Sequence, residues 1–333
     1  MQAVERKQEA TAGNADSQRT RVIGRRIVAS NVVMLELVPI DGTPVAAFSA
    51  GAHIELLLEA GARQYSLFNA PHERDVYRIA VRREEDGRGG SAEVFDRLVE
   101  GDTLSVRGPF NHFSMAADSG EAVLIAGGIG ITPILAMAEQ CRTDGTTFEL
   151  HYAGRGRQHM AFAEQLLGDD WQAQSRLYAP DLDGPGQLDV AQVIPEPAAG
   201  KHLYVCGPAG LIEAVQVAAR DKGWPESRVH FERFGADAPQ PADGDQPFEL
   251  EIASSGQRIV VGAQETAADA LARAGVVIPT SCGSGVCGSC CTRIKEGTPD
   301  HRDLYFSPEE QARGDQFTPC CSRAVTAVLV LDL

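Results

Sequence analysis

Three closely spaced cysteines and one distant cysteine form the most informative pattern in this chain. Six of its eight cysteines fall within the last 52 residues, where Cys282, Cys287 and Cys290 form a C-x4-C-x2-C run. A further 29 residues separate Cys290 from Cys320. This is the plant-type spacing for a 2Fe-2S cluster, in which four thiolates bind two irons. Glycines between the cysteines leave room for the inorganic sulfide and allow backbone N–H groups to point at sulfur.

Zinc and disulfides are the alternative interpretations of clustered cysteines. Structural zinc sites usually use two short-spaced pairs, and disulfide frameworks belong mainly to small secreted domains. Cys320 has the spacing expected of the fourth ligand, and its neighbour Cys321 would point to the opposite side if the segment were extended. We therefore expect Cys321, Cys291 and Cys141 to be small buried side chains rather than ligands.

Two short motifs in the first third of the chain offer groups that could hold a flavin. Arg63-Gln-Tyr65-Ser66 provides a guanidinium for a phosphate and a ring that can pack on an isoalloxazine. The sequence Gly87-Arg-Gly-Gly90-Ser91 precedes a helical pattern from Glu93 to Val99, so its backbone N–H groups could bind a phosphate. The alternatives are an exposed arginine beside a core tyrosine, and a hairpin turn.

Two further glycine motifs follow apolar strand-like segments. Gly127-Gly128-Ile-Gly130-Ile-Thr132-Pro133 comes directly after a buried strand and leads into a helix, which suits close approach of a nucleotide. A proline occupies the third glycine position of the Rossmann fingerprint, so that fingerprint is absent. The second motif, Cys206-Gly207-Pro208, could form the opposite wall of the same crevice, with a plain core thiol as the alternative for Cys206.

The elements around these motifs predict a multidomain protein with three folded units. Strand patterns such as Val32–Leu37, His53–Leu58 and Tyr77–Val81 indicate an antiparallel β-barrel, and a parallel α/β domain follows. After a linker rich in proline and aspartate, paired strands and a helix capped by Thr266 indicate a third unit that carries the clustered cysteines. The expected ranges are 1–18 disordered, 19–116 barrel, 117–235 α/β, 236–247 linker and 248–333 cluster domain.

Composition excludes several classes of function. The formal net charge is −16, which argues against binding to nucleic acid. The longest apolar runs are far shorter than the roughly 20 residues that cross a bilayer, so we expect a cytoplasmic protein without a membrane anchor. No Rieske Cys-His pairs and no array of two histidines and a carboxylate are recognisable, so the chain is not expected to be an oxygenase itself.

The chain contains, in this order, the motifs RxYS, GRGGS, GGIGITP and CGP and the C-terminal cysteines. In this it resembles the phthalate dioxygenase reductase family, which includes vanillate demethylase and carnitine monooxygenase reductases. The resemblance implies FMN on the barrel, NADH on the α/β domain and a 2Fe-2S cluster on a C-terminal ferredoxin domain, whose fold would be α+β ferredoxin-like of the β-grasp type. By motif, it places Arg63, Tyr65, Ser66, Ala80, Arg82, Gly90 and Ser91 at FMN. It places Gly127, Gly128, Gly130, Arg155, Gly207 and Pro208 at the dinucleotide, and Thr132, Cys206 and Phe234 near the reacting rings.

The resemblance also implies an activity. Hydride from NADH carries two electrons, whereas the cluster accepts one at a time, so a flavin is expected between them. We therefore expect an NADH-dependent oxidoreductase, a monomer, that supplies electrons to a separate Rieske-type terminal oxygenase. A cytochrome P450 as acceptor is one alternative, and a cluster-based redox-sensing module is another. His301 is expected to be a capping or salt-bridged loop histidine and not a catalytic residue.

Overall fold

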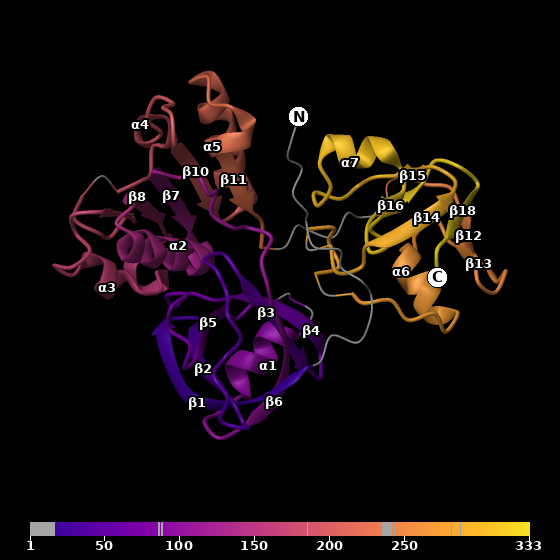
Figure 1. The fold of residues 1–333 in the computed structure, drawn as a ribbon, viewed down its shortest axis with the longest axis horizontal. Coiled ribbons are helices and arrows are strands. Elements are labelled where there is room, and N and C mark those ends of the chain that lie inside the picture. Colours follow the sequence, from indigo (N-terminus) through magenta and orange to yellow (C-terminus); the bar gives the residue numbers. More distant parts are fainter. Residues whose placement is uncertain are drawn as a thin grey trace.

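The structure, a computed structural model, describes residues 17–85, 87, 89–184, 186–234, 242, 244–280, 282–286 and 288–333. Within these residues the strands form three main sheets and one two-stranded ribbon, arranged in succession along the chain (Figure 1). Residues 1–16, most of the predicted linker and the predicted ligand Cys287 lie outside the described residues.

The first sheet is an antiparallel barrel of six strands in the order β4-β3-β6-β1-β2-β5. A bridge between Leu67, directly after β4, and Ile79 in β5 brings the two edge strands together and closes the sheet. The bounds are β1 (Gln18–Ala29), β2 (Val32–Pro39), β3 (His53–Leu58), β4 (Gly61–Ser66), β5 (Tyr77–Arg82), α1 (Gly90–Asp96) and β6 (Thr103–Phe110). Gln18 therefore belongs to a strand, although the sequence placed it in the disordered terminus.

Alternation along the barrel strands explains which side chains fill its interior. In β5, Tyr77, Ile79 and Val81 point inward and are almost fully buried. The predicted helix at Glu93–Val99 exists but begins and ends three residues earlier, at Gly90 and Asp96. Gly89, with φ 87°, forms the turn that starts it, a conformation that favours glycine.

The second sheet is parallel, with the strand order β11-β10-β7-β8-β9. Its central strand β7 is an almost continuous apolar run because helices cover both faces of such sheets. The strands are β7 (Glu121–Gly127), β8 (Thr147–Ala153), β9 (Ser175–Tyr178), β10 (Lys201–Cys206) and β11 (Val229–Glu232). The helices are η1 (Gly128–Gly130), α2 (Ile131–Asp144), η2 (Arg157–His159), α3 (Ala163–Leu167), α4 (Val190–Val193), α5 (Ala209–Asp221) and η3 (Glu226–Arg228).

The third sheet has the order β13-β12-β18-β14-β16, and β15 pairs with β17 in a separate ribbon. As predicted, β12 pairs with β13, and the Thr266 hydroxyl accepts a hydrogen bond from the Asp269 N–H at 3.1 Å to cap α6. The elements are β12 (Phe248–Ile252), β13 (Arg258–Val261), α6 (Ala267–Arg273), β14 (Thr292–Glu296), β15 (Pro299–Asp300), α7 (Pro308–Arg313), β16 (Gln316–Phe317), β17 (Arg323–Ala324) and β18 (Val328–Leu331). Barrel, parallel α/β domain and α+β domain together match the predicted fold class.

The hydrophobic cores show which parts of the chain are packed together. One core joins the outer face of the barrel, including Met34 and Ala80, to helix α2 of the parallel domain through residues such as Leu135. The core of the C-terminal domain contains only residues from Phe248 onward. The barrel and the parallel domain therefore stabilise each other, whereas the C-terminal domain buries its own apolar surface.

Asp245 fixes the last described part of the predicted linker to the C-terminal domain. Its carboxylate accepts hydrogen bonds from the Arg302 guanidinium at 2.6 and 2.8 Å, and Arg323 lies 3.6 Å away. The hydrogen bonds from Arg302 lower the pKa of Asp245 to about 2.

Within the described residues, no helix has both the length and the apolar character that crossing a bilayer requires.

Candidate functional site

The two predicted glycine loops lie against each other at the carboxyl ends of β7 and β10, which are neighbouring parallel strands. A Cβ atom on Gly130 would lie 2.3 Å from the Cys206 carbonyl oxygen, and one on Gly207 would lie 3.0 Å from the Gly127 Cα. Only glycine therefore permits this contact. Pro208 ends the second loop and begins α5. The arrangement is a crevice at strand carboxyl ends, where open α/β sheets bind their ligands.

The polar residues inside this crevice are buried. Thr132 is 1% exposed, and its hydroxyl donates to the Ile129 carbonyl of the glycine loop at 3.1 Å. Cys206 is fully buried, and burial raises the pKa of its thiol well above the usual value. The thiol is therefore neutral, which suits a packing role and not a nucleophile.

Glu232 is a further residue of this crevice that the sequence interpretation did not single out. It pairs with Cys206 across β10 and β11, and its Oε2 atom is buried without a hydrogen-bond partner among the described residues. Burial raises the pKa of Glu232 to about 8. Its place two residues before Phe234, which the sequence assigned to the reacting rings, was the available signal.

The barrel side of the site brings together residues from β4 and α1. The Arg63 side chain lies against Gly90, where a Cβ atom would be 2.5 Å from the Arg63 Cγ. The Arg63 guanidinium donates to the Ala60 and Ala62 carbonyls at 2.7 and 2.8 Å. The Ser91 hydroxyl accepts the Glu84 N–H at 3.0 Å. The two sequence motifs therefore form one surface.

Of the remaining predicted flavin residues, Ala80 and Arg82 border the parallel domain. Ser66 and Ala80 are buried, and Ala80 packs in the core that joins the two domains. Tyr65 packs against the barrel core, and burial raises the pKa of its phenol. Arg82 is ion-paired with Glu84 and reaches the glycine loop, its Nη1 atom lying 3.7 Å from the position of a Cβ on Gly128.

The arginines after β8 and the aromatic residue after β11 are more exposed. Arg155 is exposed, while the Arg157 guanidinium is held by Glu164 at 2.7 Å. Asp181, which follows β9, accepts the Arg157 backbone N–H at 2.8 Å. Phe234 is 39% exposed, so one face of its ring is available to a ligand.

Three of the four predicted cluster ligands meet in the C-terminal domain, and the fourth, Cys287, is outside the described residues. The Cys320 thiol is within hydrogen-bonding distance of Cys282 and Cys290, and Cys290 and Cys320 are buried. The Ser284 N–H, and not that of a glycine, points at the Cys282 Sγ at 3.4 Å, a contact typical of a cluster loop. Gly283, Gly285 and Gly288 all have positive φ. Without Cys287, the described residues contain no group of three metal-binding side chains in ligating geometry, but the loop and its thiols fit a 2Fe-2S cluster.

Cys320 and Cys321 lie in a turn and not in an extended segment, so the predicted reason for separating their roles is wrong. The two thiols are within hydrogen-bonding distance of each other. Their other contacts differ, because Cys321 bonds the Thr318 hydroxyl at 3.2 Å and packs against Gly285. Cys141 is buried in α2 as predicted, whereas Cys291 is only partly buried and donates to Gln316 at 2.9 Å.

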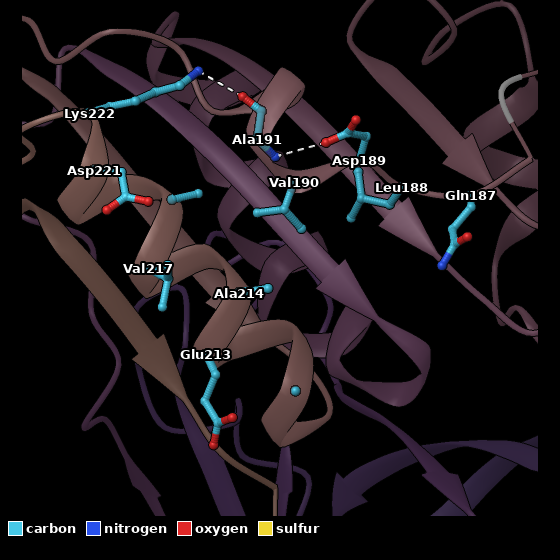
Figure 2. A pocket seen from close by; sticks show the side chains of 12 residues that line it. Gln187, Leu188, Asp189, Val190, Ala191, Glu213, Ala214, Val217, Asp221 and Lys222 are labelled. Atoms are coloured by element: carbon cyan, nitrogen blue, oxygen red, sulfur yellow. Dashed lines mark hydrogen bonds between the residues drawn. The ribbon is translucent and has the colours of Figure 1, made fainter.

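A separate groove of about 830 Å³ runs along the outer side of α5, next to residues 187–191 (Figure 2). Asp189, Glu213 and Asp221 line the groove. The Lys222 ammonium at its edge donates hydrogen bonds to the Ala191 and Ile194 carbonyls at 2.7 and 2.5 Å. This acidic lining does not suit phosphate groups, and none of the predicted site residues contributes to it. His301 is a loop residue whose Nδ1 lies 2.9 Å from the Asp303 Oδ1, a structural contact of the kind expected.

Comparison with known proteins identifies the families that two parts of this chain match. The family described as the 2Fe-2S iron-sulfur cluster binding domain matches residues 250–325, and the oxidoreductase NAD-binding domain matches residues 124–217. A vanillate O-demethylase oxidoreductase of Pseudomonas sp. (strain HR199 / DSM 7063) is 41% identical over 92% of this chain and 97% of its own length. The phthalate dioxygenase reductase of Burkholderia cepacia is 36% identical, over 95% of this chain and 97% of its own length. This chain belongs to the phthalate dioxygenase reductase family.

Solved structures support membership of the phthalate dioxygenase reductase family. A phthalate dioxygenase reductase described as modular, with electron transfer from pyridine nucleotides to [2Fe-2S], has a TM-score of 0.74 and 36% identity, and the match covers 96% of this chain and 98% of that one. An intact type IV self-sufficient cytochrome P450 monooxygenase has a TM-score of 0.83 and 35% identity, covering 98% of this chain but 43% of that one. The predicted family, fold class and oxidoreductase activity, with NAD-binding and 2Fe-2S domains, are therefore confirmed.

Proposed function

We propose that this chain is the reductase component of a Rieske-type oxygenase system, taking hydride from NADH and passing single electrons to a separate oxygenase. The observation that carries the proposal is the position of the cysteine loop, which contacts the flavin-type barrel through the Gln64–Ser289 hydrogen bond in the same chain as the nucleotide crevice. Relatives named for vanillate O-demethylase and phthalate dioxygenase systems support the oxygenase partner.

Each site residue has a role in this proposal. Arg63, Gly90 and Ser91 bind the FMN phosphate, and Tyr65, Ser66, Ala80 and Arg82 line the flavin. Gly127, Gly128, Gly130, Gly207, Pro208 and Arg155 bind NADH, with Thr132, Cys206 and Phe234 beside the reacting rings. Cys282, Cys287, Cys290 and Cys320 bind the cluster. The bound FMN supplies the link between a donor of electron pairs and an acceptor of single electrons.

The side chains of the crevice act by positioning and by excluding water. Cys206 and Thr132 provide a buried, uncharged wall, and the exposed face of Phe234 covers a ring. Because the pKa of Glu232 is about 8, its carboxyl group is neutral at about pH 7 and can donate a hydrogen bond into the crevice. None of these groups needs to act as a nucleophile.

The proposal is tested with the purified protein and the oxygenase component of a vanillate O-demethylase. We expect about one FMN, two irons and two sulfides per chain, and NADH-dependent bleaching of the oxygenase's Rieske centre. Zinc in place of iron, or no electron transfer to any Rieske oxygenase tested, would contradict the proposal. FAD in place of FMN would overturn only the choice of flavin.

A cytochrome P450 is the second candidate acceptor, because a self-sufficient P450 monooxygenase matches 98% of this chain. The two acceptors are distinguished in parallel reactions with limiting reductase. We expect faster reduction of the Rieske oxygenase, whereas faster formation of the carbon monoxide complex of a reduced P450 would favour the second candidate.

Domain boundaries, location and oligomeric state also belong to the proposal. We assign residues 18–116 to the FMN domain, because Gln18 belongs to β1, 117–235 to the NADH domain and 248–333 to the cluster domain, with 236–247 as linker. The described residues place one main sheet in each folded range, which supports the assignment. Among the described residues, the buried thiols of Cys141 and Cys206 form no disulfide, which supports a reducing compartment, the cytoplasm. We also propose that the protein is a monomer, and its molar mass from light scattering tests this.

A further inference from the structure

The cysteine loop and the barrel are joined by hydrogen bonds that link Gln64, Ser289 and Glu55 to one another. The Gln64 amide donates to the Ser289 hydroxyl at 3.0 Å and to the Glu55 carboxylate at 3.3 Å. The Ser289 hydroxyl in turn donates to the same carboxylate oxygen at 3.4 Å. Ser289 directly precedes the predicted ligand Cys290, so this contact, called here the Gln64 contact, acts on the cluster loop itself.

The barrel half of the Gln64 contact is built into the sheet. Glu55 pairs with Gln64 across β3 and β4 and with Arg107 across β3 and β6, so all three side chains lie on the same outer face. The Glu55 side chain is 7% exposed, and its second oxygen lies 3.2 Å from the Arg107 Nε. A buried carboxylate paired in this way holds the Gln64 amide in one orientation.

A second contact lies beside the first. The Tyr305 ring lies over Gly288, where a Cβ atom would be 2.3 Å from the ring, and it meets the barrel residue His112 edge-on with 6.1 Å between centroids. The His112 ring packs at a tilt of 38° against the ring of His53 in β3, with 5.7 Å between centroids. The loop residues on the amino side of Cys290 are therefore held against the barrel by a hydrogen-bonded contact and by an aromatic contact.

We propose that Gln64 is a positioning residue that fixes the cluster loop against the flavin domain and so sets the rate of electron transfer between them. The proposal rests on the flavin and cluster sites proposed above. Electron transfer slows steeply with distance, so a loop that leaves the barrel would interrupt transfer. Gln64 lies on the opposite face of β4 from Arg63 and Tyr65, so it acts on the loop and not on the flavin. Electron balance is unchanged: each NADH still delivers two electrons, which leave one at a time to the oxygenase.

Two substitutions of increasing severity test this role. We call the protein docked when its cluster loop lies on the barrel and undocked when the loop has left it. Gln64→Ala removes the amide and should lower the ratio of docked to undocked protein about tenfold, as expected for a lost hydrogen bond. Gln64→Glu adds a carboxylate beside buried Glu55, and should separate the domains further because the like charges are poorly screened. Gln172→Ala is the control, since its amide bonds Asp169 within the same segment.

The first measurement is structural and does not depend on activity. Hydrogen exchange of residues 288–291 and of β4 should become faster in the order wild type, Gln64→Ala, Gln64→Glu, and small-angle scattering should show a larger radius of gyration. The Gln172→Ala protein should behave as wild type. Unchanged exchange and radius in folded Gln64→Glu protein would overturn the proposal, whatever the acceptor of the enzyme is.

The second measurement separates positioning from general damage. NADH:ferricyanide activity and flavin content should remain as in wild type, while NADH:cytochrome c activity should fall in proportion to the docked fraction, in the order wild type, Gln64→Ala, Gln64→Glu. Equal losses in both activities would assign Gln64 to flavin binding or folding and would contradict the proposal. Loss of ferricyanide activity in the wild type itself would instead contradict the proposed function.

Discussion

Cys206 and Glu232 occupy paired positions at the carboxyl ends of neighbouring parallel strands, β10 and β11. One is a fully buried thiol, and the other has a buried carboxyl oxygen that lacks a partner among the described residues. This pairing places an ionisable acid in the crevice beside the glycine loops. Its effects are open to measurement.

Glu232→Gln should change how the stability of the protein depends on pH. The pKa of Glu232 is raised from 4.5 to about 8 by burial, so the neutral side chain contributes its full stability below about pH 4.5. That contribution is lost as the pH rises through about 8. The glutamine variant should therefore gain stability relative to wild type between about pH 5 and 9, on the order of 3 kcal/mol. Thermal melts across this range measure the difference. Parallel pH profiles for the two proteins would show that Glu232 ionises normally.

Cys320→Ser should remove most of the iron, whereas Cys321→Ser should leave it largely in place. Cys320 lies at the meeting point of Cys282 and Cys290, while the Cys321 thiol is also bonded to Thr318. Iron and sulfide analysis and the EPR signal after reduction measure the outcome, with flavin content as the control. Because the two thiols are close together, partial clusters in both variants would mean that either cysteine can serve as the ligand.

Asp181 should make the enzyme prefer NADH to NADPH. Asp181 follows β9, which neighbours β8, the strand that leads to Arg155. The Asp181 carboxylate would repel the 2′-phosphate of an NADPH bound there. Asp181→Asn keeps an acceptor for the Arg157 N–H but removes the charge. It should raise kcat/KM for NADPH about tenfold with little change for NADH. Asp183→Asn is the matched control, and a larger kcat/KM for NADPH in the wild type would reject the assignment.

A protein that ends at Gly235 should remain a flavoprotein that oxidises NADH with ferricyanide. The barrel and the parallel domain share a core to which no described residue from Phe248 onward contributes, so their packing should survive the truncation. Phe234 must be retained, because its exposed ring is assigned to the flavin. Cytochrome c reduction and transfer to the oxygenase should collapse. Full-rate reduction of the oxygenase by the truncated protein would disprove the order NADH, FMN, cluster, partner.

Local patterns were sufficient to predict the three folded units and most of the binding loops. The cysteine spacing, the glycines at 127, 128 and 130, and the Thr266 cap each depend on neighbours within a few residues, where chain geometry determines the outcome. Alternation of apolar residues likewise predicted strands β2, β3 and β5 to within two residues. The bounds of α1 and the turn at Cys320 were predicted incorrectly, because their backbone depends on glycine conformations and on packing that alternation does not encode.

The sequence by itself determined which groups this protein can bind, because a cluster loop and a nucleotide loop need particular residues at fixed local spacings. Only the tertiary structure decided how those sites are coupled. Gln64 and Ser289 are 225 residues apart, and Cys206 and Glu232 meet through parallel strands that are separated by a helix. Contacts of this kind leave no periodic signal in the chain, since they arise when separate sheets and domains pack together. For the same reason the environment that raises the pKa of Glu232 exists only in the folded protein.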